Sequence, residues 1–163
     1  MSMQTESLAR QRRAQRGVYA IEFAFVFLIS FALLYAVICY GFLLTMRLSL
    51  QNAAEDGARA GLRYQSSLDK RETEAENVAR LRSDWLPDAL KAKLNVYADT
   101  CPAAEDDCTQ AAPPCGPEWS KRCQMVVTVE VSGIEGLFPA FPNFAIPDRV
   151  TGKASMLLDG RSL

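Results

Sequence analysis

The chain has 163 residues, with 18 basic and 19 acidic side chains and no histidine. This length fits one domain of roughly 100 to 200 residues and excludes a multidomain architecture. The lack of histidine excludes imidazole-based catalysis and mixed Cys/His zinc sites, and the net charge of -1 argues against a general nucleic-acid-binding protein.

A basic segment precedes a long apolar run at the N-terminus. Residues 1–17 contain four arginines and one glutamate, and residues 18–44 contain a single charged residue, Glu22. A helix over residues 18–44 would reach about 40 Å at about 1.5 Å per residue, more than the roughly 30 Å hydrocarbon core of a bilayer. An ordinary secretory signal has a shorter apolar region and a small-residue cleavage site. A buried helix of a soluble protein is the other interpretation, but only 119 of the 163 residues follow residue 44 to cover a helix that is apolar all round. The run therefore predicts a membrane-spanning helix, and the arginines predict that its N-terminus is cytoplasmic.

Glu22 is unusual because an acid inside a spanning helix costs roughly 2.5 to 3.5 kcal/mol at the centre and less near an end. One interpretation is that its side chain simply reaches interfacial water. However, Gly17 ends the basic segment, Glu22 is the fifth residue after it, and the aromatic residue Phe23 follows. This pattern resembles the prepilin-type signal of the Tad or Flp pilus family. The resemblance implies cleavage between Gly17 and Val18 by a membrane prepilin peptidase, with Glu22 and Phe23 recognised in processing and assembly.

The spacing of Val18 and Glu22 also has a physical reason. Cleavage after Gly17 would give Val18 a free ammonium group, one helical turn from the Glu22 carboxylate. In a low dielectric each charge offsets the other, either within one helix or between staggered helices. In the second case the pair would set the axial register of one subunit against the next, so we expect Glu22 to be an assembly residue.

The helix is predicted to continue beyond the membrane, because no proline interrupts residues 45–63. Small residues recur every four positions on one face of this extension: Ala53, Gly57 and Gly61, together with Ala54 and Ala58. Such faces let helices approach closely. Alanine is also simply a good helix former, but glycine costs roughly 1 kcal/mol in a helix interior, which favours a packing role. The tract from residue 49 to residue 60 resembles the signature of TadE-type pseudopilins and extends the resemblance over about residues 12–63.

The expected organisation is a leader over residues 1–17, a transmembrane and assembly helix over 18–64, and a periplasmic α+β domain over 65–163. Ser66 and Asp69 have capping-box spacing and start a predicted helix whose charged residues are expected to face solvent. Its expected buried stripe consists of Ala75, Val78, Ala79, Leu81, Trp85 and Leu86. Patterns rich in β-branched residues predict a short antiparallel sheet with strands near residues 94–97, 125–131 and 150–158.

Four cysteines lie between residues 101 and 123, namely Cys101, Cys108, Cys115 and Cys123. Outside the cytoplasm this density predicts two disulfides, and the sequence leaves all three pairings open. A zinc site with four thiolates is the alternative, but it would show closer Cys-x-x-Cys pairs. The fifth cysteine, Cys39, is in the apolar run and is interpreted as a packing residue.

The resemblance implies a minor pseudopilin of a Tad or Flp type IVb pilus, anchored in the bacterial inner membrane or built into the pilus. The resemblance implies four kinds of partner: the prepilin peptidase, other minor pseudopilins, the major Flp pilin and the inner-membrane platform proteins of the pilus machine. The rival interpretation is an uncleaved signal-anchor protein of the envelope that acts as a scaffold or binding module without a filament role. The sequence contains no catalytic, metal-binding or cofactor-binding motif, so an enzyme is not expected.

Overall fold

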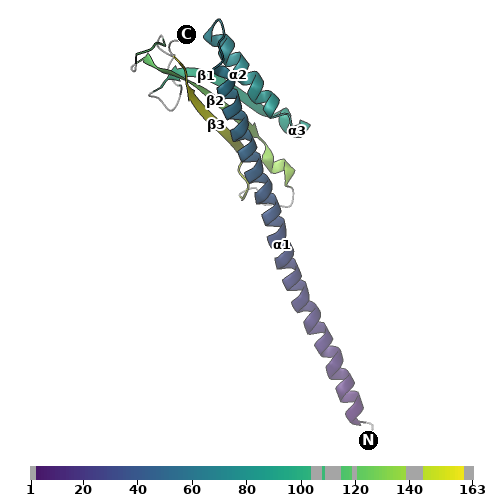
Figure 1. Cartoon of the computed structure of the whole chain (residues 1–163). Coiled ribbons are helices and arrows are strands. Elements are labelled where there is room, and N and C mark those ends of the chain that lie inside the picture. Colours follow the sequence, from purple (N-terminus) through teal and green to yellow (C-terminus); the bar gives the residue numbers. More distant parts are fainter. Residues whose placement is uncertain (1–2, 104–107, 109–114, 119–120, 139–144, 160–163) are drawn as a thin grey trace. The chain divides into compact units, whose positions relative to one another are not determined.

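The computed structural model describes residues 3–103, 108, 115–118, 121–138 and 145–159, with side chains from residue 19 onward. In chain order the elements are α1 (Met3–Gly61), α2 (Leu68–Arg82), α3 (Asp88–Lys91), β1 (Leu94–Pro102), β2 (Cys123–Ser132), the 3₁₀ helix η2 (Ile134–Leu137) and β3 (Arg149–Leu157), shown in Figure 1. A long N-terminal helix, a three-stranded antiparallel sheet and two disulfides confirm the predicted α+β fold.

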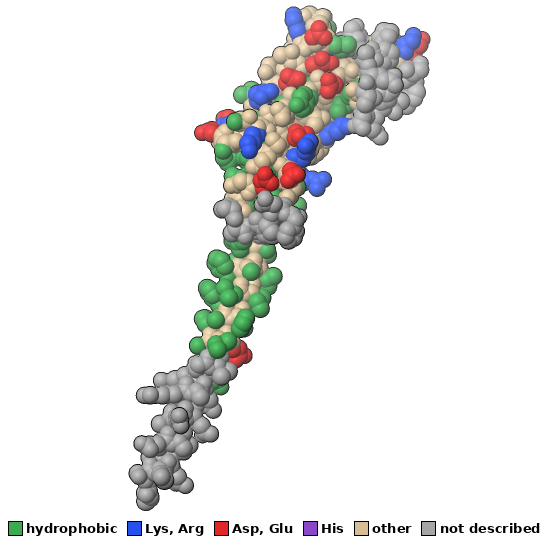
Figure 2. Space-filling model, turned by 180° about the vertical axis from the view of Figure 1, so that it is seen from behind, with side chains coloured by type: hydrophobic (Ala, Val, Ile, Leu, Met, Phe, Trp, Pro, Cys, Tyr) green, Lys and Arg blue, Asp and Glu red, His purple; other side chains and the backbone are tan. Residues whose placement is uncertain are grey.

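The chain divides into two compact units, Met1–Phe42 and Leu43–Leu163. The first unit is the N-terminal part of α1, which is apolar and long enough to cross a membrane. From Tyr19 to Leu34 every side chain is exposed. Figure 2 shows the hydrophobic side chains that surround this part of the helix. An apolar surface of this kind requires lipid or another apolar helix around it.

The second unit is built on a sheet in the order β1-β2-β3, with β2 in the centre. The register pairs Leu94 with Val131 and Val131 with Val150. Because side chains alternate between the faces of a strand, every second residue of β2 points toward the helices. These residues are fully buried: Met125, Val127, Val129 and Val131. The strands therefore form where β-branched runs predict them, and they extend one or more residues beyond most of the predicted limits.

The last turns of α1 belong to the core of this second unit. Met46, Leu50, Ala54 and Ala58 are at most 1% exposed and lie in the same hydrophobic cluster as the buried face of β2. Figure 1 shows α2 lying beside this part of α1. The compact unit thus begins at Leu43, inside α1, and not at the end of the helix.

The N-cap and the buried face in the region of α2 differ from the sequence-based expectation. The N-cap is Ser67, whose hydroxyl accepts a hydrogen bond from the Lys70 N–H at 3.4 Å, so the helix begins one residue later than a cap at Ser66 would set it. Leu81 and Trp85 are 74% and 44% exposed, although a buried stripe was expected to include them. The buried face follows a spacing of four residues through Arg71, Ala75 and Ala79, and at about 100° per residue Leu81 points away from it.

The charged residues of α2 are not all solvated, as the sequence pattern suggested. Arg71 is 2% exposed. Glu72 and Glu76 are partly buried, and each accepts a hydrogen bond from the backbone of β1. The expectation of a solvent-facing charged side is therefore wrong for these three residues, because α2 lies against the sheet on the side that carries them.

Candidate assembly site

The predicted cleavage and assembly residues lie in one continuous helix. The backbone of Gly17 and Val18 is helical, while the side chain of Val18 lies outside the described part of the chain. Glu22 and Phe23 are exposed on the same helix. Among the ion pairs between described residues, none involves Glu22. The one acid of the apolar run is therefore presented at the surface of α1, where a positive group from another chain could reach it.

An aromatic ladder starts beside Glu22. The ring centroids of Phe23 and Phe27 are 6.1 Å apart with an interplanar angle of 24°, and those of Phe27 and Phe31 are 6.2 Å apart with an angle of 20°. The three side chains are 70%, 55% and 58% exposed. Rings spaced by four residues lie above one another on a helix, so this ladder follows from the sequence. It forms a broad apolar ridge that favours insertion into lipid or packing on another helix.

The predicted small-residue face packs inside the second unit. A β carbon on Gly57 would lie 2.8 Å from the carbonyl oxygen of Ala75 and 2.9 Å from the β carbon of Ala79, both in α2. A β carbon on Gly61 would lie 3.0 Å from the side chain of Met125 in β2. The other members of the face, Ala53, Ala54 and Ala58, are at most 1% exposed. The structure thus uses these residues to bring α1 close to its own helix α2 and to the sheet.

The four outer cysteines form two disulfides between sequence neighbours, Cys101–Cys108 and Cys115–Cys123. Cys39 is buried and is not in a disulfide. Cys101 lies opposite Gln124 in the register, whereas Cys123 shares the helix-facing side of β2 with Met125. Because side chains alternate between the two faces along each strand, Cys101 and Cys123 point to opposite faces of the sheet. The two disulfides therefore link the connection between β1 and β2 to both faces.

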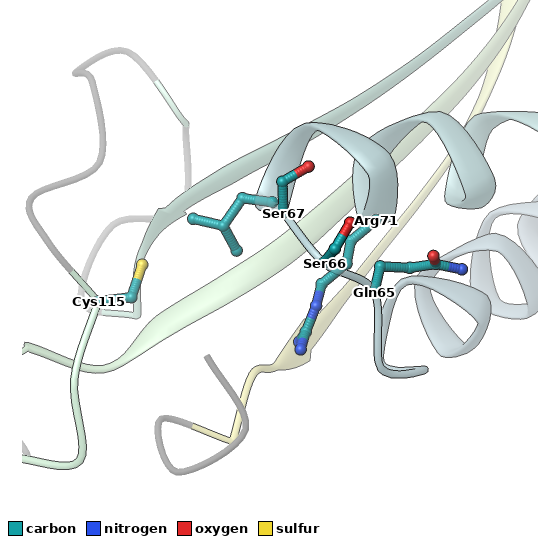
Figure 3. Close-up of a pocket in the computed structure, with 6 residues that line it drawn as sticks. Gln65, Ser66, Ser67, Arg71 and Cys115 are labelled. Carbon is teal, nitrogen blue, oxygen red and sulfur yellow. The ribbon is translucent and has the colours of Figure 1, made fainter.

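A pocket of about 210 Å³ lies at the start of α2, and its lining residues are Gln65, Ser66, Ser67, Leu68, Arg71 and Cys115. Figure 3 shows the Arg71 side chain extending past Ser66 and Gln65. The Ser66 hydroxyl accepts a hydrogen bond from the Lys70 ammonium at 2.8 Å. Among these lining residues there is no carboxylate and no free thiol, so they provide no acid–base or nucleophilic pair. Within the described residues, no group of three Cys, Asp or Glu side chains is placed to hold a metal ion.

Comparison with protein families identifies the helix. Residues 17–59 match the family model described as TadE-like protein. This segment is TadE-like. The match confirms the resemblance of this segment to the TadE-like family. No match was found among curated proteins or among solved structures, so the assignment depends on the TadE-like segment.

The TadE-like segment includes Gln51, a residue to which the sequence pattern assigned no role. Gln51 hydrogen-bonds to the backbone of β3 through both ends of its amide. Glu72 and Glu76, beyond the segment, bond to β1 in a related way. No sequence signal marks these residues, because a polar residue on an amphipathic helix looks the same whether it faces solvent or the edge of a sheet.

Proposed function

We propose that this chain is a minor pseudopilin of a Tad or Flp type IVb pilus. It is inserted in the bacterial inner membrane with residues 1–17 in the cytoplasm and the second unit in the periplasm. Prepilin peptidase cuts it after Gly17, which removes 17 of 163 residues and leaves 146. The mature chain then joins the pilus, or the complex at its base, through the exposed part of α1.

The observation that carries this proposal is where the family match begins. The TadE-like segment starts at residue 17, the glycine after which the basic leader would be removed. It continues through an apolar helix whose side chains the chain itself leaves exposed from Tyr19 to Leu34. A leader cut off in front of such a helix, and not behind it, leaves a membrane anchor that can also serve as a polymerisation surface.

Charge supports the same proposal. Cleavage would create an ammonium group at Val18, and Glu22 is the only acid in the apolar run. An isolated carboxylate in hydrocarbon is costly, and an ion pair with the ammonium group of a neighbouring subunit would offset that cost. The partners that fit are therefore chains with a parallel apolar helix and a free N-terminal amine: other minor pseudopilins and the major Flp pilin. The prepilin peptidase and the inner-membrane platform proteins act on the chain before and during assembly.

The experiment that tests processing uses two glycines of the same helix. Gly17→Leu should block cleavage in cells that contain prepilin peptidase, because the peptidase would no longer find glycine before the cut. Gly41→Leu is the matched control, since a β carbon on Gly41 meets nothing within 4 Å. We expect a shortened chain for wild type and Gly41→Leu, and a full-length chain for Gly17→Leu, on immunoblots of the membrane fraction.

The rival function, an uncleaved signal-anchor protein, predicts a different pattern. Immunoblots would then show a full-length chain for wild type, Gly17→Leu and Gly41→Leu, with and without the peptidase. That result would leave the membrane helix in place and remove the pilus assignment.

A further inference from the structure

The sheet of the second unit has two outer edges, and on each edge side chains from a helix hydrogen-bond to some of the outward-facing backbone groups. In β1 the N–H of Thr100 donates to the Glu72 carboxylate at 3.0 Å, and the N–H of Ala98 donates to the Glu76 carboxylate at 3.3 Å. In β3 the N–H of Lys153 donates to Oε1 of Gln51 at 3.1 Å. The Nε2 group of Gln51 donates in turn to the Lys153 carbonyl oxygen at 2.8 Å.

The contacts with Gln51 show which residues of β3 point their backbone groups away from the sheet. In an antiparallel ladder, successive residues alternately bond to the neighbouring strand and point away from it. Since both backbone groups of Lys153 bond to Gln51, the outward-pointing residues of β3 are Arg149, Thr151, Lys153, Ser155 and Leu157. Gln51 engages the middle one. It therefore divides the edge into two stretches, each with only two outward residues.

The edge of β1 is divided in a similar way. Its outward residues are Leu94, Val96, Ala98, Thr100 and Pro102. Glu76 and Glu72 engage Ala98 and Thr100, and Pro102 has no N–H to offer. Only Leu94 and Val96 are left as consecutive outward residues. A pairing over two residues is too short to be stable, since even an isolated two-stranded hairpin is marginal.

We propose that Gln51, Glu72 and Glu76 are edge-covering residues. By occupying backbone groups of the two edge strands, they keep the second unit from pairing strand to strand with other copies of this chain. Exposed strand edges are templates for such pairing, and the risk rises with local concentration, as it does for chains confined to a membrane. The edge-covering residues thereby restrict contact between chains to other surfaces, among them the exposed helix of the first unit.

The test replaces the edge-covering residues of the β1 edge in the full chain, purified in detergent. Glu72→Ala with Glu76→Ala frees two N–H groups of β1, and we expect the association constant from light scattering to rise about tenfold. Glu72→Gln with Glu76→Gln keeps an acceptor at each site and should behave as wild type. Asp69→Ala with Glu74→Ala removes the same charge from α2 but leaves the bonds of Glu72 and Glu76 to β1 in place, and should also behave as wild type.

A third substitution separates strand pairing from association that follows loss of stability. Thr100→Pro removes the N–H that Glu72 covers, and proline is tolerated where an edge N–H faces outward. Added to the double alanine variant, it removes one of the two freed N–H groups and leaves that of Ala98, so the association constant should fall toward the wild-type value. The proposal is overturned if the double alanine variant does not associate more strongly than wild type, or if adding Thr100→Pro does not lower the association constant.

Discussion

Gly152 in β3 lies directly against the backbone of Leu50 in α1. A β carbon at this position would overlap the carbonyl group of Leu50 and lie 2.6 Å from the backbone nitrogen of Gln51. The strand therefore approaches the helix more closely than any residue with a side chain would allow. This contact also brings Lys153 within reach of the Gln51 amide.

Gly152→Ala should destabilise the second unit by about 2–4 kcal/mol, because the clash is with backbone that cannot rotate away. Gly136→Ala is the control, since a β carbon there meets nothing within 4 Å. Urea unfolding followed by tryptophan fluorescence reports on this unit, as Trp85 and Trp119 both lie within residues 43–163. Equal midpoints for the two variants would contradict the close approach.

Leu50→Ala should cost about 2–5 kcal/mol of unfolding free energy, because Leu50 is fully buried in the core of the second unit. Leu48→Ala, on the same helix with a side chain 65% exposed, should change the free energy by less than about 0.5 kcal/mol. The same urea titration measures both. If the two substitutions had similar effects, the end of α1 would not be part of the outer domain.

Each disulfide closes a short loop, with sequence separations of 7 and 8 residues. Loop-closure entropy for such lengths gives about 2–3 kcal/mol per bridge, so replacing either pair by serine should lower stability by about that amount. Peptide mapping without reduction should find Cys101 with Cys108 and Cys115 with Cys123. A fragment that joins Cys101 to Cys115 or Cys123 would contradict the structure.

Glu22→Ala and Glu22→Leu should leave membrane insertion intact, because removing an acid from an apolar helix lowers the cost of insertion. Incorporation into pili should fall roughly tenfold or more if a charge-assisted bond to a neighbouring amine is lost. Ser30→Ala, in the same exposed helix, serves as the control. The measurement is the amount of the chain in sheared pili relative to the membrane fraction. Unchanged incorporation of the Glu22 variants would remove its assembly role.

Local patterns predicted much of this fold. The spanning helix follows from composition, and the strands follow from β-branched runs such as residues 125–131. The presence of two disulfides follows from the density of cysteines between residues 101 and 123. Each of these features depends on residues that are close together in the sequence, so local patterns are enough to predict it.

The unpredicted features depend on contacts between distant residues. The buried position of Arg71 follows from the packing of α2 on the sheet, which no local pattern encodes. In the sequence Gly152 resembles any other strand residue, and only the structure shows that it lies against Leu50, which is distant in the sequence. The disulfide pairing likewise required the register of β1 against β2. The small-residue face of α1 was recognised as a packing surface, but only the structure shows that α2 and the sheet cover it.

The proposed function requires that a leader is removed from in front of an apolar helix that is retained. The most direct test is the intact mass of the chain purified from the membranes of cells that contain prepilin peptidase. The account predicts a molecule of 146 residues that begins at Val18, the length left after 17 of 163 residues are removed. A molecule that still carries residues 1–17 would contradict it.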